Sequence, residues 1–233
     1  MTRAKNPIID VIIPAYNEEN AVGNVIDEIP KELVRHIIVC NNGSLDRTKQ
    51  MATAAGAIVV DQPEKGYGAA CLKGMEYLAA LDIAPEIVVF LDADYSDYPE
   101  ELPLLIAPII SEKIDLVIGS RANEQLQKGA MTPQQIFGNW LATNLIALLY
   151  GYKFTDLGPF RAIRYDALTK MNMSDRTFGW TVEMQVKAAK MGLKTTEVPV
   201  RYRVRIGKSK ISGTIRGTIL AGQKIIWTIF KYL

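Results

Sequence analysis

Two residue types that carry much enzyme chemistry are scarce in this chain of 233 residues, which has two cysteines and one histidine. Cys40 and Cys71 form no Cys-x-x-Cys pair and lie in apolar or small-residue surroundings, which favours two buried thiols in a reducing compartment. His36 stands just before a predicted strand, and we interpret it as structural. The chain therefore offers no residues for a zinc site or a Ser-His-Asp hydrolase.

Two phosphate-binding motifs are also missing. No Gly-x-Gly-x-x-Gly follows the first predicted strand, where a dinucleotide-binding fold places it, and there is no P-loop. The single Gly-x-Gly, at 66–68, follows the third predicted strand instead. We expect neither a dehydrogenase nor a P-loop NTPase.

Long apolar runs and a strong net charge are absent as well. No window reaches about 18 uninterrupted apolar residues, so no transmembrane helix is predicted. The polar residues 1–6 are too few for a signal peptide. A net charge of +2 gives no reason to expect nucleic acid as a partner. These features predict a cytoplasmic protein that is either free or peripheral on the cytoplasmic membrane face.

The most informative stretch is 87–91, five apolar residues that run directly into Asp92-Ala93-Asp94. The run is typical of a central parallel strand buried on both faces. In open α/β sheets ligands bind at the carboxyl ends of the strands. Two carboxylates there can bind Mg²⁺ or Mn²⁺ together with substrate phosphates. For an isolated Asp-x-Asp, a solvated strand end is the better interpretation, so the rest of the chain has to decide.

The first half of the chain alternates between strand and helix patterns. Strands are expected at 8–13, 37–40, 57–60, 87–91 and 115–119, with helices between them. Pro14 is expected to end the first strand, and Asn17 to cap the helix that follows. Gly66 and Gly68 are expected to let the backbone approach a ligand at a helix N-terminus that favours anions. The pattern predicts an α/β fold with a doubly wound, mostly parallel sheet.

The second half predicts a polar loop at 120–133, helices at 137–150 and 180–191, and strands near 160–164 and 195–200. Trp140 and Leu148 belong to one apolar face of the helix at 137–150, which suits either the core or a lipid surface, and we favour the core. A basic loop at 201–213 leads to a basic amphipathic helix at about 214–233, which suits packing or a membrane surface. With no internal repeat and no low-complexity segment, one domain over 1–233 is expected.

Taken together, these strand-end turns and basic loops resemble glycosyltransferase family 2, the GT-A nucleotide-sugar transferases. The matching segments are 14–18 (Pro-Ala-Tyr-Asn-Glu), 42–46 (Asn-Gly-Ser-Leu-Asp), Lys65-Gly66 and Asp92-Ala93-Asp94. The branch that it resembles most is the dolichyl-phosphate mannose and glucose synthases, through 119–121, 156–161 and 207–210. The resemblance implies a Rossmann-like GT-A fold with a nucleotide-sugar half at about 1–120 and an acceptor half at about 121–233 that carries C-terminal helices.

The resemblance also implies roles for individual residues. The nucleotide-sugar donor would contact residues from both halves of the chain: Pro14, Tyr16, Glu18, Asn42, Lys65, Asp92, Ala93 and Arg121. Asp94, with Asp92, would hold Mg²⁺ or Mn²⁺ against the diphosphate, and Ser96 is near enough to assist through water. Residues of the basic loop would bind the diphosphate or an acceptor phosphate: Arg203, Arg205, Ser209 and Lys210.

The acceptor leaves the role of Glu183 open. Many inverting relatives use a carboxylate at this position to deprotonate an acceptor hydroxyl, so Glu183 is a candidate catalytic base. A lipid phosphate is already an anion and needs no base, in which case Glu183 would hold basic side chains in place. We predict transfer of a hexose from a UDP- or GDP-sugar to a polyprenyl or dolichyl phosphate. The alternatives are a soluble hydroxyl acceptor and a non-catalytic nucleotide-sugar-binding subunit.

Two departures from the family pattern affect specificity. The turn after the second strand usually carries Asp-Asp or Asp-Asn but has Asn41-Asn42 here, which leaves the choice between uracil and guanine open because an amide both donates and accepts. In the basic loop, the usual arginine position is held by Val204, between Arg203 and Arg205.

Overall fold

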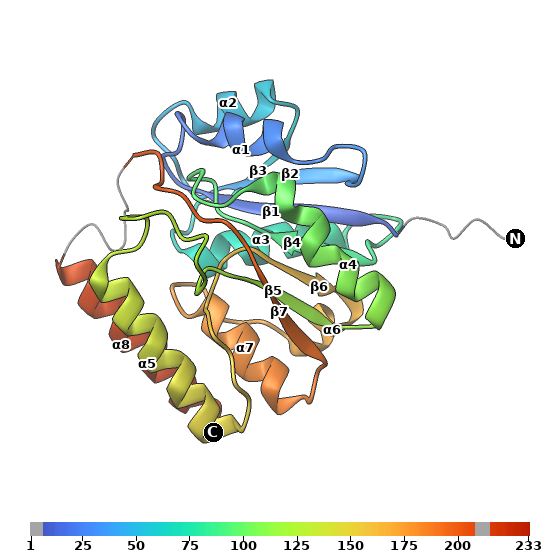
Figure 1. Cartoon of the computed structure of the whole chain (residues 1–233). Helices are drawn as coiled ribbons and strands as arrows, with labels where there is room; N and C mark the ends of the chain where they lie inside the picture. The colour runs from blue at the N-terminus through green and yellow to red at the C-terminus, as the bar shows by residue number, and fades with distance from the viewer. Residues whose placement is uncertain (1–6, 208–214) are drawn as a thin grey trace, which may run out of the picture.

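The computed structural model describes residues 7–207 and 215–233, without the side chains of 215–218. A seven-stranded sheet crosses the molecule with the strand order β3-β2-β1-β4-β6-β5-β7 (Figure 1). The strands are β1 (Ile9–Ala15), β2 (His36–Asn41), β3 (Ile58–Asp61), β4 (Ile87–Phe90), β5 (Leu116–Ser120), β6 (Arg161–Arg164) and β7 (Thr195–Pro199). β6 is antiparallel to both neighbours, and the other strand pairs are parallel. The predicted α/β fold with a mostly parallel sheet is confirmed.

Helices cover both faces of this sheet. One face carries α1 (Val22–Glu28), α2 (Thr48–Ala54), the 3₁₀ turn η1 (Pro99–Glu101) and α4 (Leu102–Glu112). The other face carries α3 (Tyr67–Ala79), α6 (Tyr165–Met171) and α7 (Trp180–Lys190). The long helices α5 (Pro133–Tyr150) and α8 (Ile215–Lys231) lie side by side and pack against α7 (Figure 1). The prediction from sequence missed α6, a short helix directly after β6.

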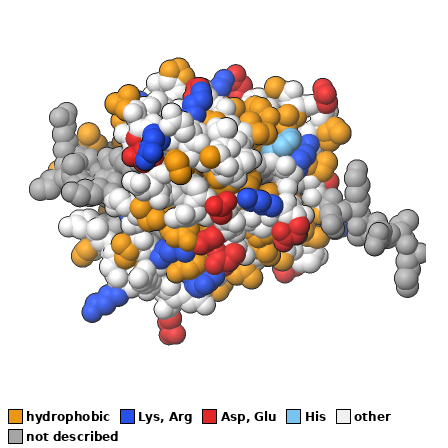
Figure 2. Space-filling view, turned by 90° about the horizontal axis from the view of Figure 1, so that it is seen from above, with side chains coloured by type: hydrophobic (Ala, Val, Ile, Leu, Met, Phe, Trp, Pro, Cys, Tyr) orange, Lys and Arg blue, Asp and Glu red, His pale blue; other side chains and the backbone are white. Residues whose placement is uncertain are grey.

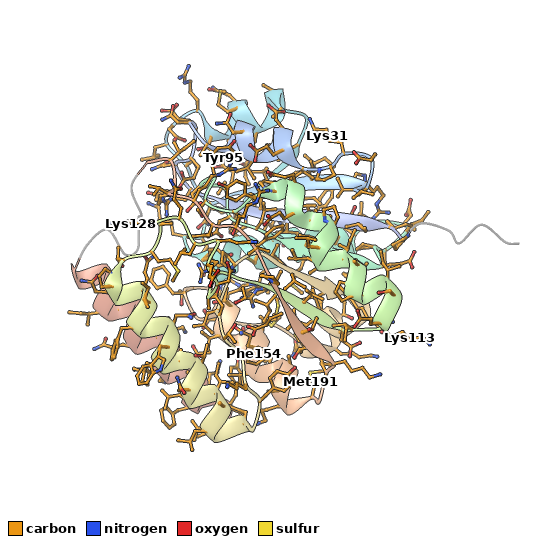
Figure 3. All side chains as sticks on the ribbon, in the orientation of Figure 1. Lys31, Tyr95, Lys113, Lys128, Phe154 and Met191 are labelled. Atoms are coloured by element: carbon orange, nitrogen blue, oxygen red, sulfur yellow. The ribbon has the colours of Figure 1, made fainter. Side chains whose placement is uncertain are left out.

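The central strands are buried on both faces, as their unbroken apolar runs predict. In β1, Val11 and Ile13 pack beneath α1, whereas Ile12 points to the α3 side. In β4, Val89 points to the same side as Val11, and Phe90 points to the α3 side. Side chains fill the space between the sheet and the helices on both faces (Figure 3). This packing holds the carboxyl ends of β1 and β4 at fixed positions.

Charged side chains are mixed on the surface above α1 and α2. On the face seen in Figure 2, acidic and basic side chains are mixed. Arg47 and Glu19 form one exposed ion pair, at 3.1 Å. As far as the described residues cover it, this face shows no extended area of one charge. Among the described residues, no helix is long and apolar enough to cross a membrane.

The prediction that Pro14 ends the first strand is wrong, because β1 continues to Ala15. Pro14 pairs with Cys40 of β2 in the parallel register. On its other side, β1 pairs with β4 through Ile9–Ile12 only, so the strand passes beyond its neighbour before it reaches the proline. A proline without an N–H group is tolerated where one side of a strand has no partner.

The prediction that Asn17 caps the first helix is also wrong. α1 begins at Val22, and Asn17 lies upstream with a positive φ of 54°. Its side-chain oxygen accepts a hydrogen bond of 2.9 Å from the backbone N–H of Leu45. Asparagine tolerates the left-handed conformation better than most residues, so Asn17 turns the chain towards the loop after β2.

Only part of the apolar face predicted for the helix at 137–150 packs against the core, through Leu145. Trp140 is 57% exposed and Leu148 is 79% exposed, whereas the helix buries its smaller residues Ala142 and Thr143 together with Ile146. The helix starts earlier than predicted, at Pro133, because Thr132 forms a capping box with Gln135.

Candidate active site

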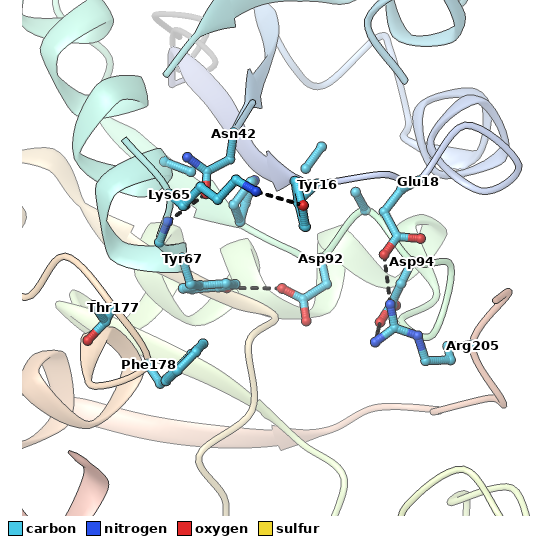
Figure 4. A pocket seen from close by; sticks show the side chains of 15 residues that line it. Tyr16, Glu18, Asn42, Lys65, Tyr67, Asp92, Asp94, Thr177, Phe178 and Arg205 are labelled. Carbon is cyan, nitrogen blue, oxygen red and sulfur yellow. Dashed lines mark hydrogen bonds and ion pairs between the residues drawn. The ribbon is translucent and has the colours of Figure 1, made fainter. Parts of the chain in front are cut away.

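A cavity of about 320 Å³ lies at the carboxyl ends of β1, β2 and β4 (Figure 4). It is lined by Pro14, Ala15, Tyr16, Glu18, Asn42, Lys65, Gly66, Tyr67, Ala70, Asp92, Ala93, Asp94, Thr177, Phe178 and Arg205. Seven of the eight residues predicted to contact a nucleotide-sugar are in this set, although they come from four separate segments of the chain. Parallel strands bring their ends to one edge of the sheet, which is why these segments meet.

Asp92 stands at the base of the cavity, directly beyond β4. Its carboxylate accepts a hydrogen bond of 3.0 Å from the hydroxyl of Tyr67, the first residue of α3. Burial, followed by the negative charge of Asp94, raises the pKa of Asp92 to about 7. Burial and the charges of Asp92 and Asp94 also raise the pKa of the neighbouring Asp97 well above its usual range. Three carboxylates are thus crowded in one place.

Asp94 is held by its own turn and by the basic loop. One oxygen accepts a hydrogen bond of 2.9 Å from the backbone N–H of Ser96. The other oxygen lies 2.9 Å from the guanidinium of Arg205, which also donates a 2.7 Å hydrogen bond to Glu18. The backbone N–H of Ile206 donates to the carbonyl oxygen of Asp94 at 3.0 Å. The basic loop is therefore fastened onto the Asp-x-Asp segment (Figure 4).

These carboxylates fit a hard divalent cation. Burial, and after it the charge of Asp94, raises the pKa of Asp92, and a bound cation would offset the repulsion between the two carboxylates. The described residues contain no group of three or more His, Cys, Asp or Glu side chains placed to hold a metal ion. Asp94 and Asp92 would therefore supply two ligands, and diphosphate oxygens and water the rest, the usual arrangement for Mg²⁺.

Asn42 and Lys65 line the cavity on the opposite side from Arg205. The Asn42 side chain accepts from the backbone N–H of Gly66 at 2.7 Å and donates to the carbonyl of Glu64 at 2.6 Å. Asn42, which we predict to contact the nucleotide, therefore also holds the turn at 62–66 in place. The ammonium group of Lys65 donates a 3.0 Å hydrogen bond to the hydroxyl of Tyr16.

At the start of α3, two backbone N–H groups have partners in another segment of the protein. The backbone N–H groups of Gly68 and Ala69 donate to the carbonyl oxygens of Thr177 and Arg176, at 3.1 and 2.9 Å. A Cβ atom on Gly68 would collide with the carbonyl oxygen of Asp175. These glycines do permit a close backbone approach, but the approaching segment belongs to the protein itself. The N–H groups of Gly68 and Ala69 are therefore used within the protein, whereas Gly66, Tyr67 and Ala70 line the first cavity, so a ligand beside this helix end stays a prediction.

A second cavity of about 290 Å³ adjoins the first and shares Tyr67, Asp92, Asp94, Phe178 and Arg205 with it. Its other walls are the start of α5, with Gln134, Gln135, Gly138 and Asn139, and Ala221 and Ile225 of α8. Arg121 lines this second cavity, where Asp156 holds it through two hydrogen bonds of 2.8 and 2.7 Å. Arg121 is thus the one predicted donor residue that lies outside the first cavity.

The other basic-loop predictions have different outcomes. Arg203 lines neither cavity: it pairs with Glu28 at 2.7 Å, donates to the backbone oxygen of Tyr95 and stacks on the Tyr95 ring. Arg203 therefore ties the loop to Glu28 and Tyr95, and its contact with a phosphate stays a prediction. Ser209 and Lys210 lie outside the described residues.

Glu183 lies on α7, fully buried, and lines neither cavity. Its carboxylate accepts hydrogen bonds from the backbone N–H groups of Ser174 and Asp175 and from the hydroxyl of Tyr232, and it pairs with Lys187 at 2.7 Å. Burial alone would raise the pKa of Glu183, but the hydrogen bonds from Lys187 and Tyr232 lower it. This geometry favours the structural reading of Glu183 that the sequence left open.

Four cavity residues lie outside the matching segments and were not predicted from the sequence: Tyr67, Ala70, Thr177 and Phe178. Tyr67 could have been predicted, because it directly follows Lys65-Gly66, which matches the family motif. Residues 177–178 could not, because they belong to a polar stretch with no recognisable motif. Glu183 fixes the start of that stretch through Ser174 and Asp175, and the start of α3 fixes its centre.

Comparisons with known proteins identify a family and several relatives. Residues 10–171 match the profile described as glycosyl transferase family 2. The chain is 32% identical to the dolichyl-phosphate hexose transferase of Haloferax volcanii, over 93% of this chain and 91% of that one. It is 29% identical to the undecaprenyl-phosphate mannosyltransferase of Micrococcus luteus, over 88% of each. Glucosyl-3-phosphoglycerate synthase from Mycobacterium tuberculosis, solved with Mn²⁺, UDP-glucose and phosphoglyceric acid, superposes with a TM-score of 0.77 at 26% identity, covering 97% of this chain and 79% of that one.

Proposed function

The chain belongs to glycosyl transferase family 2, and on that basis we propose that it transfers a hexose from a UDP- or GDP-sugar to the phosphate of a polyprenyl or dolichyl lipid. The observation that carries this proposal is the junction of two cavities at Asp92 and Asp94. One cavity suits a nucleotide-sugar, the other leads towards α5 and α8, and the shared carboxylates mark where donor and acceptor would meet.

The donor would bind in the first cavity. Tyr16, Asn42 and Lys65, which line this cavity, would contact the base and ribose, and Asp92 and Ala93 would approach the ribose and the diphosphate. Mg²⁺ or Mn²⁺ held by Asp94 and Asp92 would neutralise the charge of the departing nucleoside diphosphate. The solved relative that contains Mn²⁺ and UDP-glucose supports this part of the proposal.

The acceptor phosphate would enter through the second cavity, whose cations are Arg121 and Arg205. An arginine fork suits bidentate binding of a phosphate. One phosphate oxygen would form a bond to the anomeric carbon while the bond from that carbon to the nucleoside diphosphate breaks on the opposite side, which inverts the configuration. The nucleophile is already an anion, so the reaction needs no base, in keeping with the position of Glu183 outside both cavities.

The lipid acceptor is supported by the two relatives whose names specify dolichyl and undecaprenyl phosphate. A second candidate is a small phosphorylated acceptor, because the solved relative binds phosphoglyceric acid. Both acceptors carry a phosphate, and the cations of the second cavity suit either one.

The test is incubation of the protein with Mn²⁺, a labelled UDP- or GDP-hexose and undecaprenyl phosphate. We expect label in the organic phase after solvent extraction, and none with Asp94→Ala, whose melting temperature should stay close to that of the wild type. Label transferred only to phosphoglycerate would favour the soluble acceptor. No transfer with any common donor would contradict the proposal. A Mn²⁺-dependent rise in melting temperature with UDP or with GDP identifies the base.

A further inference from the structure

Phe178 lies on the boundary between the two cavities. Five residues line both of them: Tyr67, Asp92, Asp94, Phe178 and Arg205. The polar members of this set pair with one another, since Tyr67 donates to Asp92 and Arg205 pairs with Asp94. In the view of Figure 4, Asp92 lies between Phe178 and Arg205. The boundary therefore has a charged side at Arg205 and an apolar side at Phe178.

Packing within the protein does not account for the Phe178 side chain. It is half-buried, yet it belongs to neither of the two apolar clusters that the described residues form on the faces of the sheet. None of the aromatic pairs in this part of the chain includes it. Trp180, two residues further on, is instead buried in the core beside Phe90. The ring of Phe178 thus lines the cavities without adding to the core.

The backbone that carries Phe178 is fixed by the residues around it. The carboxylate of Asp175 accepts hydrogen bonds of 2.8 and 3.2 Å from the backbone N–H groups of Thr177 and Gly179, one on either side of the ring. Lys224 of α8 pairs with the same carboxylate at 2.7 Å. A Cβ atom on Gly179 would lie only 2.5 Å from it, so the turn has no room for a larger residue. A turn that is ordered in advance lowers the cost of binding a ligand against it.

We propose that the hexose of the donor stacks on the ring of Phe178. This inference rests on the proposed function, because it assumes a sugar nucleotide in the first cavity and a phosphate acceptor in the second. The new bond joins the anomeric carbon to the acceptor, so the hexose has to lie at the boundary that the two cavities share. A pyranose ring exposes C–H groups on its face, and their slight positive charge is attracted to the negative face of an aromatic ring. Tyr67, the other aromatic residue of the boundary, packs against the core instead.

The remaining boundary residues suit other parts of the reactants. Asp92 and Asp94 suit a metal–diphosphate complex, and Arg205 suits a phosphate. These groups are the same for every sugar carried on one nucleotide. A ring that contacts the hexose alone would therefore act on the affinity for the sugar nucleotide and leave the affinity for the free nucleoside diphosphate unchanged.

Titration calorimetry with Mn²⁺ and without acceptor tests this assignment, with UDP against UDP-glucose and GDP against GDP-mannose as ligand pairs. For Phe178→Ala we expect the Kd of the sugar nucleotide to rise about tenfold, because the stacked area is lost, while the Kd of the nucleoside diphosphate stays the same. Phe178→Tyr keeps the ring and should bind both ligands like the wild type. Phe178→Leu keeps an apolar side chain without a ring, and its Kd for the sugar nucleotide should rise at least about threefold.

The matched control is Phe137→Ala, which removes an exposed phenylalanine that lines neither cavity and should leave every Kd unchanged. Because Phe178 is in neither core cluster, the melting temperatures of its variants without ligand should stay close to that of the wild type. Equal binding of the sugar nucleotide by Phe178→Ala and the wild type would overturn the assignment. An equal loss for the nucleoside diphosphate would also overturn it, because the ring would then contact the nucleotide.

A failure of the proposed function would look different. If the wild type binds neither UDP nor GDP with Mn²⁺, the donor site itself is wrong, and the assignment of Phe178 is overturned with it. If Phe178→Leu binds the sugar nucleotide like the wild type, the donor site stands, but the side chain only fills space and the stacking is overturned.

Discussion

Arg205 places its guanidinium between the carboxylates of Asp94 and Glu18, at 2.9 and 2.7 Å. One oxygen of Asp94 accepts from Ser96 and the other pairs with Arg205, so a cation held by Asp94 would share an oxygen with one of these partners. A guanidinium that neutralises the same carboxylate competes with a divalent cation for it. In the free protein, therefore, Arg205 stabilises the crowded acids, and a metal–diphosphate complex would have to displace it from Asp94.

Replacement of this arginine should therefore tighten metal binding. In Arg205→Gln the carboxylates lose their positive partner, and we expect the Kd for Mn²⁺ in the absence of nucleotide to fall about tenfold, equivalent to about 1.4 kcal/mol. Titration calorimetry measures this directly. Arg203→Gln is the control, because Arg203 pairs with Glu28 and should leave the Kd unchanged. Weaker or equal Mn²⁺ binding by Arg205→Gln would show that the two cations do not compete.

Glu183 supports the site at a distance, through the stretch that carries Thr177 and Phe178. The pKa of Glu183 is lowered in the folded protein, so its bonds add stability that is complete above the unfolded pKa near 4.5 and is lost as the pH falls through the folded value. We expect Glu183→Gln to lower the free energy of unfolding by about 2 kcal/mol near neutral pH, and by less at about pH 4.

Urea unfolding at the two pH values measures this difference. The control Glu76→Gln removes an exposed ion pair with Lys73 and should change the free energy of unfolding little at either pH. If Glu183→Gln leaves the free energy of unfolding unchanged at neutral pH but abolishes transfer, Glu183 takes part in the reaction. That result would contradict a purely structural role for Glu183.

Among the elements, the contact between the start of α3 and the stretch 174–179 joins two segments that both line the first cavity. The helix N–H groups of Gly68 and Ala69 bind carbonyls of this stretch, and Arg176 pairs with Glu64 across the same contact. A residue larger than glycine at position 68 cannot keep this spacing.

Gly68→Ala should therefore separate the two segments. We expect a loss of about 2 kcal/mol in the free energy of unfolding, together with a smaller rise in melting temperature on adding Mn²⁺ and nucleotide. Gly23→Ala is the matched control, because Gly23 is also helical but has open space around it, and it should gain up to about 1 kcal/mol. Equal stabilities in the two variants would contradict the role assigned to this contact.

Element order was predictable from the sequence because hydrophobic periodicity is set locally. The strands appeared within one to two residues of their predicted positions, and the strand ends that meet at Asp92 followed from parallel pairing. What could not be predicted depends on contacts between distant segments. The strand through Pro14 depends on where β4 ends, and the partner of the α3 N-terminus lies more than a hundred residues away in sequence. The outward turn of Trp140 likewise depends on the position of α7, which periodicity does not specify.

At the scale of the whole molecule, the two halves share one sheet. β6 belongs to the second half, yet it lies between β4 and β5 of the first half and pairs with both. Residues 1–120 alone would contain β4 and β5 without the strand that joins them. Both apolar clusters also include residues from each half, such as Phe160 and Ala162 beside Val11. The donor and acceptor halves therefore share their core and should not fold separately.

We thus expect a single cooperative unfolding transition for the full chain. Circular dichroism and the fluorescence of Trp180, which is buried beside Phe90, should give the same midpoint in urea. Mn²⁺ with the preferred nucleoside diphosphate should shift both signals together, because binding to the folded state stabilises the whole cooperative unit. A fragment of residues 1–120 should show no cooperative transition. Two separate midpoints, or a folded fragment, would mean that the halves are independent domains. The pairing of β6 with β4 and β5 would then add little to stability.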